Sequence, residues 1–191
     1  MSRGTVISDP QADYLAQVDQ HSHHLVTTTP IHNHIHAGAF FSSGAADTNM
    51  GAGASFTLLY STPVITSGIM HARFYVAADR QVTITAYENV VTSADGTQLG
   101  EANHNRLSSN ASAANVYHTP TITTPGDLLF TNVIPGSGSK AGGSVEGEYE
   151  FILAPETKYS FAVTNNGVTG GVAQVTFDWY DTSFTQDKGY P

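Results

Sequence analysis

The amino-acid sequence predicts an all-β protein that folds as an antiparallel, two-layer β-sandwich of jelly-roll-like type, with an immunoglobulin-like arrangement as the alternative. Apolar residues alternate with polar ones over 159–163 and again over 173–179, which is the period of half-buried strands. Between these runs, Asn-Asn-Gly at 165–167 tolerates the positive φ of a tight reversal, so the chain is expected to end in a β-meander. The composition agrees, because only 12% of the residues are charged and the strand-favouring Thr, Val and aromatic residues are abundant.

The same alternation predicts earlier strands. In chain order they are Ser55–Ser61, Ile69–Ala78, Gln81–Val90, Val116–Thr123 and the short apolar run Leu128–Pro135. In the second run, Met70, Ala72, Phe74 and Val76 are predicted to face inward, and His71, Arg73 and Tyr75 outward. Pro120 has no amide hydrogen, so the fourth run is expected at a sheet edge or a bulge. Glu101–Ala114 is expected to be a long polar loop, and no helix of any length is expected.

Residues 1–37 differ from the rest and are predicted to form an extended arm, followed by the sandwich at 38–181 and a short tail at 182–191. The arm holds six of the nine histidines and has no sustained apolar stripe. If it is extended, His32, His34 and His36 share one face, because alternate residues of a strand point the same way. Imidazole binds Zn²⁺, Ni²⁺ and Cu²⁺, so these three residues are a possible transition-metal site, and the alternative is a solvated polar arm.

The charge balance excludes some partners. The chain has 7 Lys and Arg against 16 Asp and Glu, a formal net charge of -9. Neutralising phosphates needs clustered Lys and Arg, so neither nucleic acid nor an anionic membrane surface is an expected partner. The chain has no cysteine, and its start lacks the apolar stretch of a signal peptide. We therefore expect a soluble protein made in the cytoplasm.

Two further polar groups are candidate sites. Glu148 and Glu150 share a strand face, as the paired carboxylates of a glycosidase would, but a solvated strand edge is the more economical interpretation. Asn103, His104, Asn105 and Arg106 form a dense polar loop that either binds a partner or satisfies its own backbone. The sequence contains no nucleophile elbow and no phosphate-binding glycine motif after a strand, so we predict no catalytic residues and no enzyme activity.

Six segments within residues 71–181 occur in a suggestive order: HARFYV, TAYENV, ANHNR, VYHTPTIT, LAPETKYSFAVTNN and VTFDWYD. In this order they resemble a family of tailed-bacteriophage virion proteins, the head decoration, cement or head-fibre proteins. The resemblance covers most of the β-domain and not the histidine-rich arm. It implies a small, often trimeric β-domain without catalysis, located in the virion on the outer capsid surface.

The resemblance therefore implies the major capsid protein as partner and stabilisation of the shell as function. The residues expected to contact the capsid or a neighbouring subunit are His21, His23, His24, Leu25, Val26, His32, His34 and His36, with the loop at 103–106 as a second contact. The alternative is a head-fibre or tail-associated module that recognises host glycans, with Tyr75, Tyr87 or Tyr117 stacking on sugar rings. Apart from the possible metal, no cofactor is expected.

Overall fold

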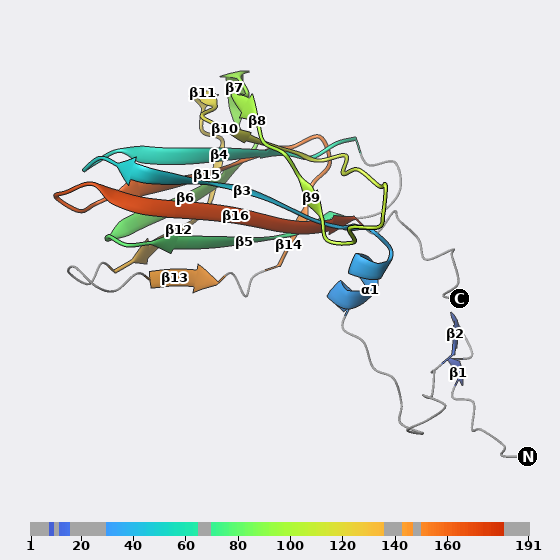
Figure 1. Ribbon diagram of the computed structural model, residues 1–191. Coiled ribbons are helices and arrows are strands. Elements are labelled where there is room, and N and C mark those ends of the chain that lie inside the picture. The colour runs from blue at the N-terminus through green and yellow to red at the C-terminus, as the bar shows by residue number, and fades with distance from the viewer. Residues whose placement is uncertain are drawn as a thin grey trace, which may run out of the picture.

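The computed structural model describes residues 30–64, 70–135 and 150–181, together with the backbone of short strands at 8–9, 12–15 and 143–146. The described residues form two stacked antiparallel sheets with one short helix at one end (Figure 1). The predicted all-β sandwich is therefore confirmed, whereas its finer jelly-roll assignment stays a prediction. Strands β1 (Ser8–Asp9) and β2 (Ala12–Leu15) pair with each other as a separate two-stranded sheet.

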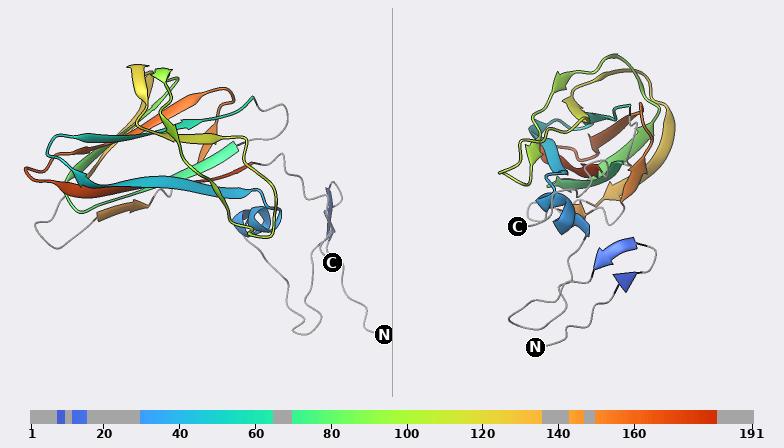
Figure 2. Two further views of the ribbon diagram at one scale, coloured as in Figure 1. Left: turned by 45° about the horizontal axis from the view of Figure 1, so that its top comes forward. Right: turned by 90° about the vertical axis from the view of Figure 1, so that its right-hand side faces the viewer.

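The first large sheet contains six strands. In spatial order they are β12 (Asp127–Ile134), β6 (Val82–Glu88), β15 (Lys158–Asn165), β4 (Ser55–Ser61), β10 (Asn115–His118) and β8 (Thr97–Gln98). A short ribbon of β7 (Val91–Ala94) and β11 (Thr121–Thr124) stands away from this layer, as Figures 1 and 2 show.

The second large sheet faces the first. In spatial order it contains β13 (Gly143–Glu146), β5 (Met70–Ala78), β16 (Gly171–Asp181), β3 (Phe40–Met50) and β9 (Ala102–Asn103). Strand β14 (Phe151–Leu153) pairs with β5 at the end away from β13. The long β16 is therefore flanked on both sides along most of its length.

The core fills the space between the sheets with the inward residues that alternation predicts. Every second residue of β5 from Met70 to Val76 is buried, and so are their counterparts on β6, β15 and β16. Aromatic rings from both layers meet in this space: Phe161 lies 4.8 Å from Phe177 and Tyr60 lies 5.4 Å from Trp179, ring centroid to ring centroid. Such edge-on contacts add to the stabilisation from buried apolar area.

The Asn-Asn-Gly turn at 165–167 is held by a buried amide. Asn165 is fully buried, and its Nδ2 donates to the carbonyl oxygens of Met50, Gly51 and Thr169 at 3.0, 3.1 and 3.0 Å. Its Oδ1 accepts a hydrogen bond from the amide of Gly167 at 2.8 Å. One side chain thus ties the β15–β16 turn to the β3–β4 turn.

The sequence-based assignments failed in three places. Strand β3 was missed because FFSSGAADTNM lacks apolar alternation. The strand also needs glycine at position 44, where a Cβ would lie only 2.4 Å from the Val175 carbonyl oxygen. The expected single strand at 116–123 is two strands with different partners, because Thr119 adopts a positive φ of 56° just before Pro120. The run at 128–135 is a strand as predicted, the edge strand β12, although most of its residues are exposed.

The third correction concerns the N-terminal segment. Residues 30–36 form the helix α1 (Pro30–His36), so the expectation of an extended chain is wrong there. Pro30 suits the first helical position, where its missing amide hydrogen costs nothing. The helix ends in a Schellman motif: Gly38 has a φ of +67° and donates to Ile35 O, while Ala39 N donates to His34 O. The other parts of the predicted arm and the tail at 182–191 lie outside the described residues, apart from the backbone of β1 and β2.

Candidate functional site

A polar cluster covers the outer face of the second sheet, beside α1. His71 and Arg73 project from β5, and Tyr180 projects from β16 in register with His71. Glu150, which directly precedes β14, joins them: its Oε1 lies 2.6 Å from His71 Nδ1, and its Oε2 accepts a hydrogen bond from Arg73 Nη2 at 2.8 Å. The Tyr180 hydroxyl donates a further short hydrogen bond to Oε1. One carboxylate therefore gathers three side chains from two strands.

These contacts shift the acidity of the groups involved. Burial alone would raise the pKa of Glu150, but hydrogen bonds from Tyr180, Arg73 and His71 outweigh it and lower that pKa to about 2. The pKa of Tyr180 rises to about 12, first because the phenol is desolvated and then because it donates to this carboxylate. At neutral pH the cluster therefore contains an ionised Glu150 and a protonated Tyr180. Glu150 is exposed and directly precedes the edge strand β14, in agreement with the solvated-edge interpretation, but its carboxylate is also paired with three side chains. Glu148 lies outside the described residues.

Helix α1 packs on this cluster through His34. The His34 ring stacks on Tyr180 at a centroid distance of 4.1 Å, and the His71 ring stacks at 4.6 Å. Burial lowers the pKa of His34, and the neighbouring His71 lowers it further, while Glu150 opposes both. The stack therefore places a neutral imidazole on the aromatic ring and fixes one face of the helix.

The polar loop at 103–106, for which either partner binding or self-satisfaction was expected, holds the end of α1. Asn105 Nδ2 donates to the His36 carbonyl oxygen at 3.0 Å, and Asn103 Nδ2 donates to that of Gly38 at 3.0 Å. The His36 carbonyl is one that the helix end leaves without an intrahelical partner, and Gly38 follows the helix in its C-terminal cap. His104 Nε2 lies 3.1 Å from Ser42 Oγ, and Arg106 donates to the Asn103 carbonyl oxygen within the loop. The geometry favours the self-satisfying interpretation of this loop.

His32 and His36 lie on the solvent side of α1. Their spacing of four residues brings the two Nε2 atoms to 2.9 Å, and both residues are exposed. His34 is on a different face of the helix. The prediction that all three histidines share one face is therefore wrong, because it assumed a strand. His21, His23, His24, Leu25 and Val26 lie outside the described residues.

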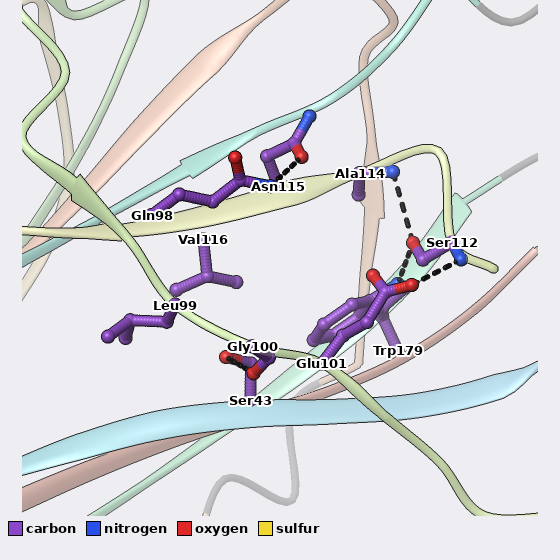
Figure 3. A pocket seen from close by; sticks show the side chains of 10 residues that line it. All are labelled: Ser43, Gln98, Leu99, Gly100, Glu101, Ser112, Ala114, Asn115, Val116 and Trp179. Atoms are coloured by element: carbon purple, nitrogen blue, oxygen red, sulfur yellow. Dashed lines mark hydrogen bonds between the residues drawn. The ribbon is translucent and has the colours of Figure 1, made fainter.

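A pocket of about 250 Å³ opens on the inner side of the same sheet, between β3 and the segments that carry β8 and β10 (Figure 3). Trp179 forms its floor and belongs to the same strand as Tyr180, so pocket and polar cluster lie on opposite faces of β16. The rim carries polar groups, namely Ser43, Gln98, Glu101, Ser112 and Asn115.

The polar side chains of the pocket are hydrogen-bonded to one another through only some of their donors and acceptors. Ser112 accepts from Trp179 Nε1 at 2.8 Å, and its own amide donates to Glu101 Oε1 at 2.7 Å. Gln98 Nε2 donates to Asn115 Oδ1 at 2.7 Å across the rim. The second carboxylate oxygen of the exposed Glu101 and the remaining Gln98 and Asn115 groups suit a small polyhydroxylated ligand, which binds through such amides and carboxylates.

Sequence reasoning missed both of these arrangements. The cluster needs the β5–β16 register, which alternation does not give, although His71 and Arg73 were correctly predicted to face outward. The pocket is made by loop residues that follow no periodic pattern. Among the described residues, no group of three or more His, Cys, Asp or Glu side chains is placed to hold a metal ion.

The predicted stacking tyrosines are half-buried on outer faces and do not meet. Tyr75 lies on the second sheet, whereas Tyr87 and Tyr117 lie on the first, three strand spacings apart in one cross-strand row, about 14 Å. They do not form one aromatic platform.

Comparison of the chain with protein-family models, with curated proteins and with solved structures finds no match in any of the three. Within the described part of the chain, the one helix, α1, falls short of the length and hydropathy that a membrane span requires.

Proposed function

We propose that this protein is a structural virion protein that binds the outer surface of a bacteriophage capsid as a decoration or cement protein and stabilises the shell. The proposal starts from the ordered resemblance of residues 71–181 to that family. The segments that carry the resemblance form β5, β6, β10, β11, β15 and β16 and the loop that holds α1, so they are framework elements of one sandwich.

The observation that carries the proposal furthest is an uncharged patch on the outer face of the first sheet. Two cross-strand rows run over β12, β6, β15 and β4: Val133, Thr83, Thr164 and Ser55 in one, and Thr131, Thr85, Ala162 and Thr57 in the other. None of these eight residues is charged, although the chain carries a net charge of -9. Depletion of charge is the compositional mark of protein–protein interface centres, so this face suits repeated contact with the major capsid protein.

Residues 1–29 are a second proposed contact. A segment that binds neighbouring capsid subunits adds contact area, and trimerisation would multiply a weak contact through effective concentration. A ligand that binds only the mature shell stabilises it by mass action. The described contacts of α1 are with the sandwich, through His34 on Tyr180 and Asn105 on the His36 carbonyl oxygen, so a variant that lacks residues 1–29 is expected to keep the helix.

The test is antibody labelling of intact virions by electron microscopy, followed by head-binding assays. Label over the whole head, and loss of binding by a Thr85→Arg and Thr131→Glu variant that still folds, are the expected results. The matched control is Thr176→Arg on the outer face of the second sheet, which should bind as the parent does. Label confined to a vertex or the tail, or full binding by the Thr85→Arg and Thr131→Glu variant, would contradict the proposal.

The pocket on Trp179 favours a second candidate, recognition of a host glycan by a head-fibre or tail-associated module. Its volume of about 250 Å³ accommodates a single sugar ring, and Glu101, Gln98 and Asn115 supply hydrogen-bonding groups. Binding on a glycan array that is lost in Glu101→Ala and Asn115→Ala variants, but retained in Thr85→Arg, would favour this candidate over the first.

A further inference from the structure

The geometry points to a bidentate transition-metal site formed by His32 and His36 on the solvent face of α1, selective for Cu²⁺ over Ni²⁺ and Zn²⁺. The site is independent of the proposed capsid role. It rests on the positions of two ring nitrogens, on the exposure of both side chains and on the way α1 is fastened to the sandwich.

The distance between the ligand atoms fits a metal ion. The two Nε2 atoms are 2.9 Å apart. Two nitrogens that bind one ion at about 2.0–2.1 Å with a right angle between them are separated by about 2.9 Å, whereas a tetrahedral angle requires about 3.3 Å. The observed separation is that of the hydrogen bond between the two rings, and it already lies close to the value for the square-planar or tetragonal geometry that Cu²⁺ and Ni²⁺ prefer. Of these two ions, Cu²⁺ forms the stronger complexes with nitrogen ligands.

The two rings also point their nitrogens at each other. The rings meet edge to face, with centroids 4.4 Å apart and planes at 65°. In the absence of metal, one Nε2–H donates to the other Nε2. When the ion binds, it replaces this hydrogen bond: the donor ring carries its proton on Nδ1, and both rings turn so that each Nε2 lone pair points at the ion. Two imidazoles from one helix face thus fill two cis positions, and water fills the others.

Contacts away from the solvent side of α1 hold the helix, and with it the two histidines, against the sandwich. His34 is stacked on Tyr180, and Asn105 binds the His36 carbonyl oxygen. The helix has only seven residues, a length that is marginal by itself. An ion that joins positions i and i+4 favours the helical conformation, so metal binding and the stability of α1 are linked.

The test is a Cu²⁺ titration followed by calorimetry and by electron paramagnetic resonance at pH 7.5. The parent for this test carries His21→Gln, His23→Gln and His24→Gln, which removes the neighbouring histidine group. We expect one Cu²⁺ per chain with two nitrogen ligands in the spectrum, and a higher Tm when Cu²⁺ is present. Ni²⁺ should bind more weakly than Cu²⁺, and Zn²⁺ more weakly than Ni²⁺.

Matched variants decide the outcome. Loss of a residue that only hydrogen-bonds to a metal ligand already weakens metal binding about 10–100-fold. Loss of a ligand itself, in His32→Gln or in His36→Gln, should therefore weaken binding at least about tenfold and abolish the rise in Tm. His118→Gln, on β10 of the other sheet, should leave binding unchanged. The thermal unfolding of each variant without metal checks that it folds. Unchanged binding in the double variant His32→Gln and His36→Gln would overturn the site, as would a loss confined to one of the two single variants.

Discussion

Replacement of Asn165 by alanine should lower the free energy of unfolding by about 3 kcal/mol. The side chain is fully buried and makes four contacts, in which two amide hydrogens are shared among three carbonyl oxygens and Oδ1 accepts the Gly167 amide. This amounts to about three hydrogen bonds at about 1 kcal/mol each, and the carbonyl groups left behind stay largely out of water. For a domain of this size the expected fall in Tm is about 6–12 °C.

The isosteric variant Asn165→Asp sharpens this prediction. At neutral pH its carboxylate would face three carbonyl oxygens in place of a donor, so it should be less stable than Asn165→Ala. The pKa of the new carboxyl should be raised in the folded state, because burial and the carbonyl dipoles disfavour its charge. Its destabilisation relative to the parent is therefore present at neutral pH and shrinks as the pH falls, when the acid can donate its proton.

Urea unfolding at pH 7 and pH 4, followed by circular dichroism, measures these differences. Asn166→Ala is the matched control, because the neighbouring Asn166 is exposed and its Nδ2 makes a single hydrogen bond, to Thr83 Oγ1. The control should change the free energy of unfolding by less than about 0.5 kcal/mol. If Asn165→Ala lies within 1 kcal/mol of the parent, the argument that this side chain ties two turns together is wrong.

Three further predictions concern the second sheet. The pKa of Glu150 is lowered from 4.5 to about 2, so its contribution to stability is complete above pH 4.5 and is lost as the pH falls toward 2. Because the side chain is partly exposed, urea titrations should show a loss of only about 1–2 kcal/mol in the free energy of unfolding over this range. Glu150→Gln should not show this loss. Gly44→Ala should cost about 1–3 kcal/mol, because its Cβ would meet the β16 backbone at 2.4 Å, whereas Gly51→Ala, with its nearest contact at 3.9 Å, should be nearly neutral in the same assay. Trp179→Phe should cost about 1–2 kcal/mol by losing its hydrogen bond to Ser112, and it should abolish the tryptophan emission of the chain, which has one Trp.

Alternation was sufficient to predict the strands that bury one face. The inward residues of β5, β6, β15 and β16 are apolar at every second position, so period 2 identifies both the strand and its buried side. Strand β3 escaped because its buried side is made partly of small residues, and its pairing with β16 depends on close approach at Gly44 and not on apolar area.

The polar sites were harder to predict because they depend on pairing across the fold. His71 and Arg73 lie 77 to 79 residues before Glu150 in the chain, and strand pairing brings them together. The helix α1 was missed because PIHNHIH has histidines at every second position and isoleucines four residues apart. It therefore fits the period of a strand as well as that of a helix. Its helical conformation depends on the cap at Gly38 and on hydrogen bonds from the loop at 103–110. An alternation of apolar and polar residues reveals neither of these contacts.

The position of α1 and the end of β16 has a mechanical consequence. Strand β3 begins at Phe40, opposite Tyr180 near the end of the antiparallel β16, and both lie at the same end of the sandwich (Figure 1). A pulling force applied through these two points runs across the ladder, so it breaks the paired residues one after another, from Tyr180–Phe40 toward Gly171–Met50. The domain should therefore unfold at low force in a single-molecule experiment, one residue pair after another. The aromatic stack of His34 on Tyr180 should be the first contact to break.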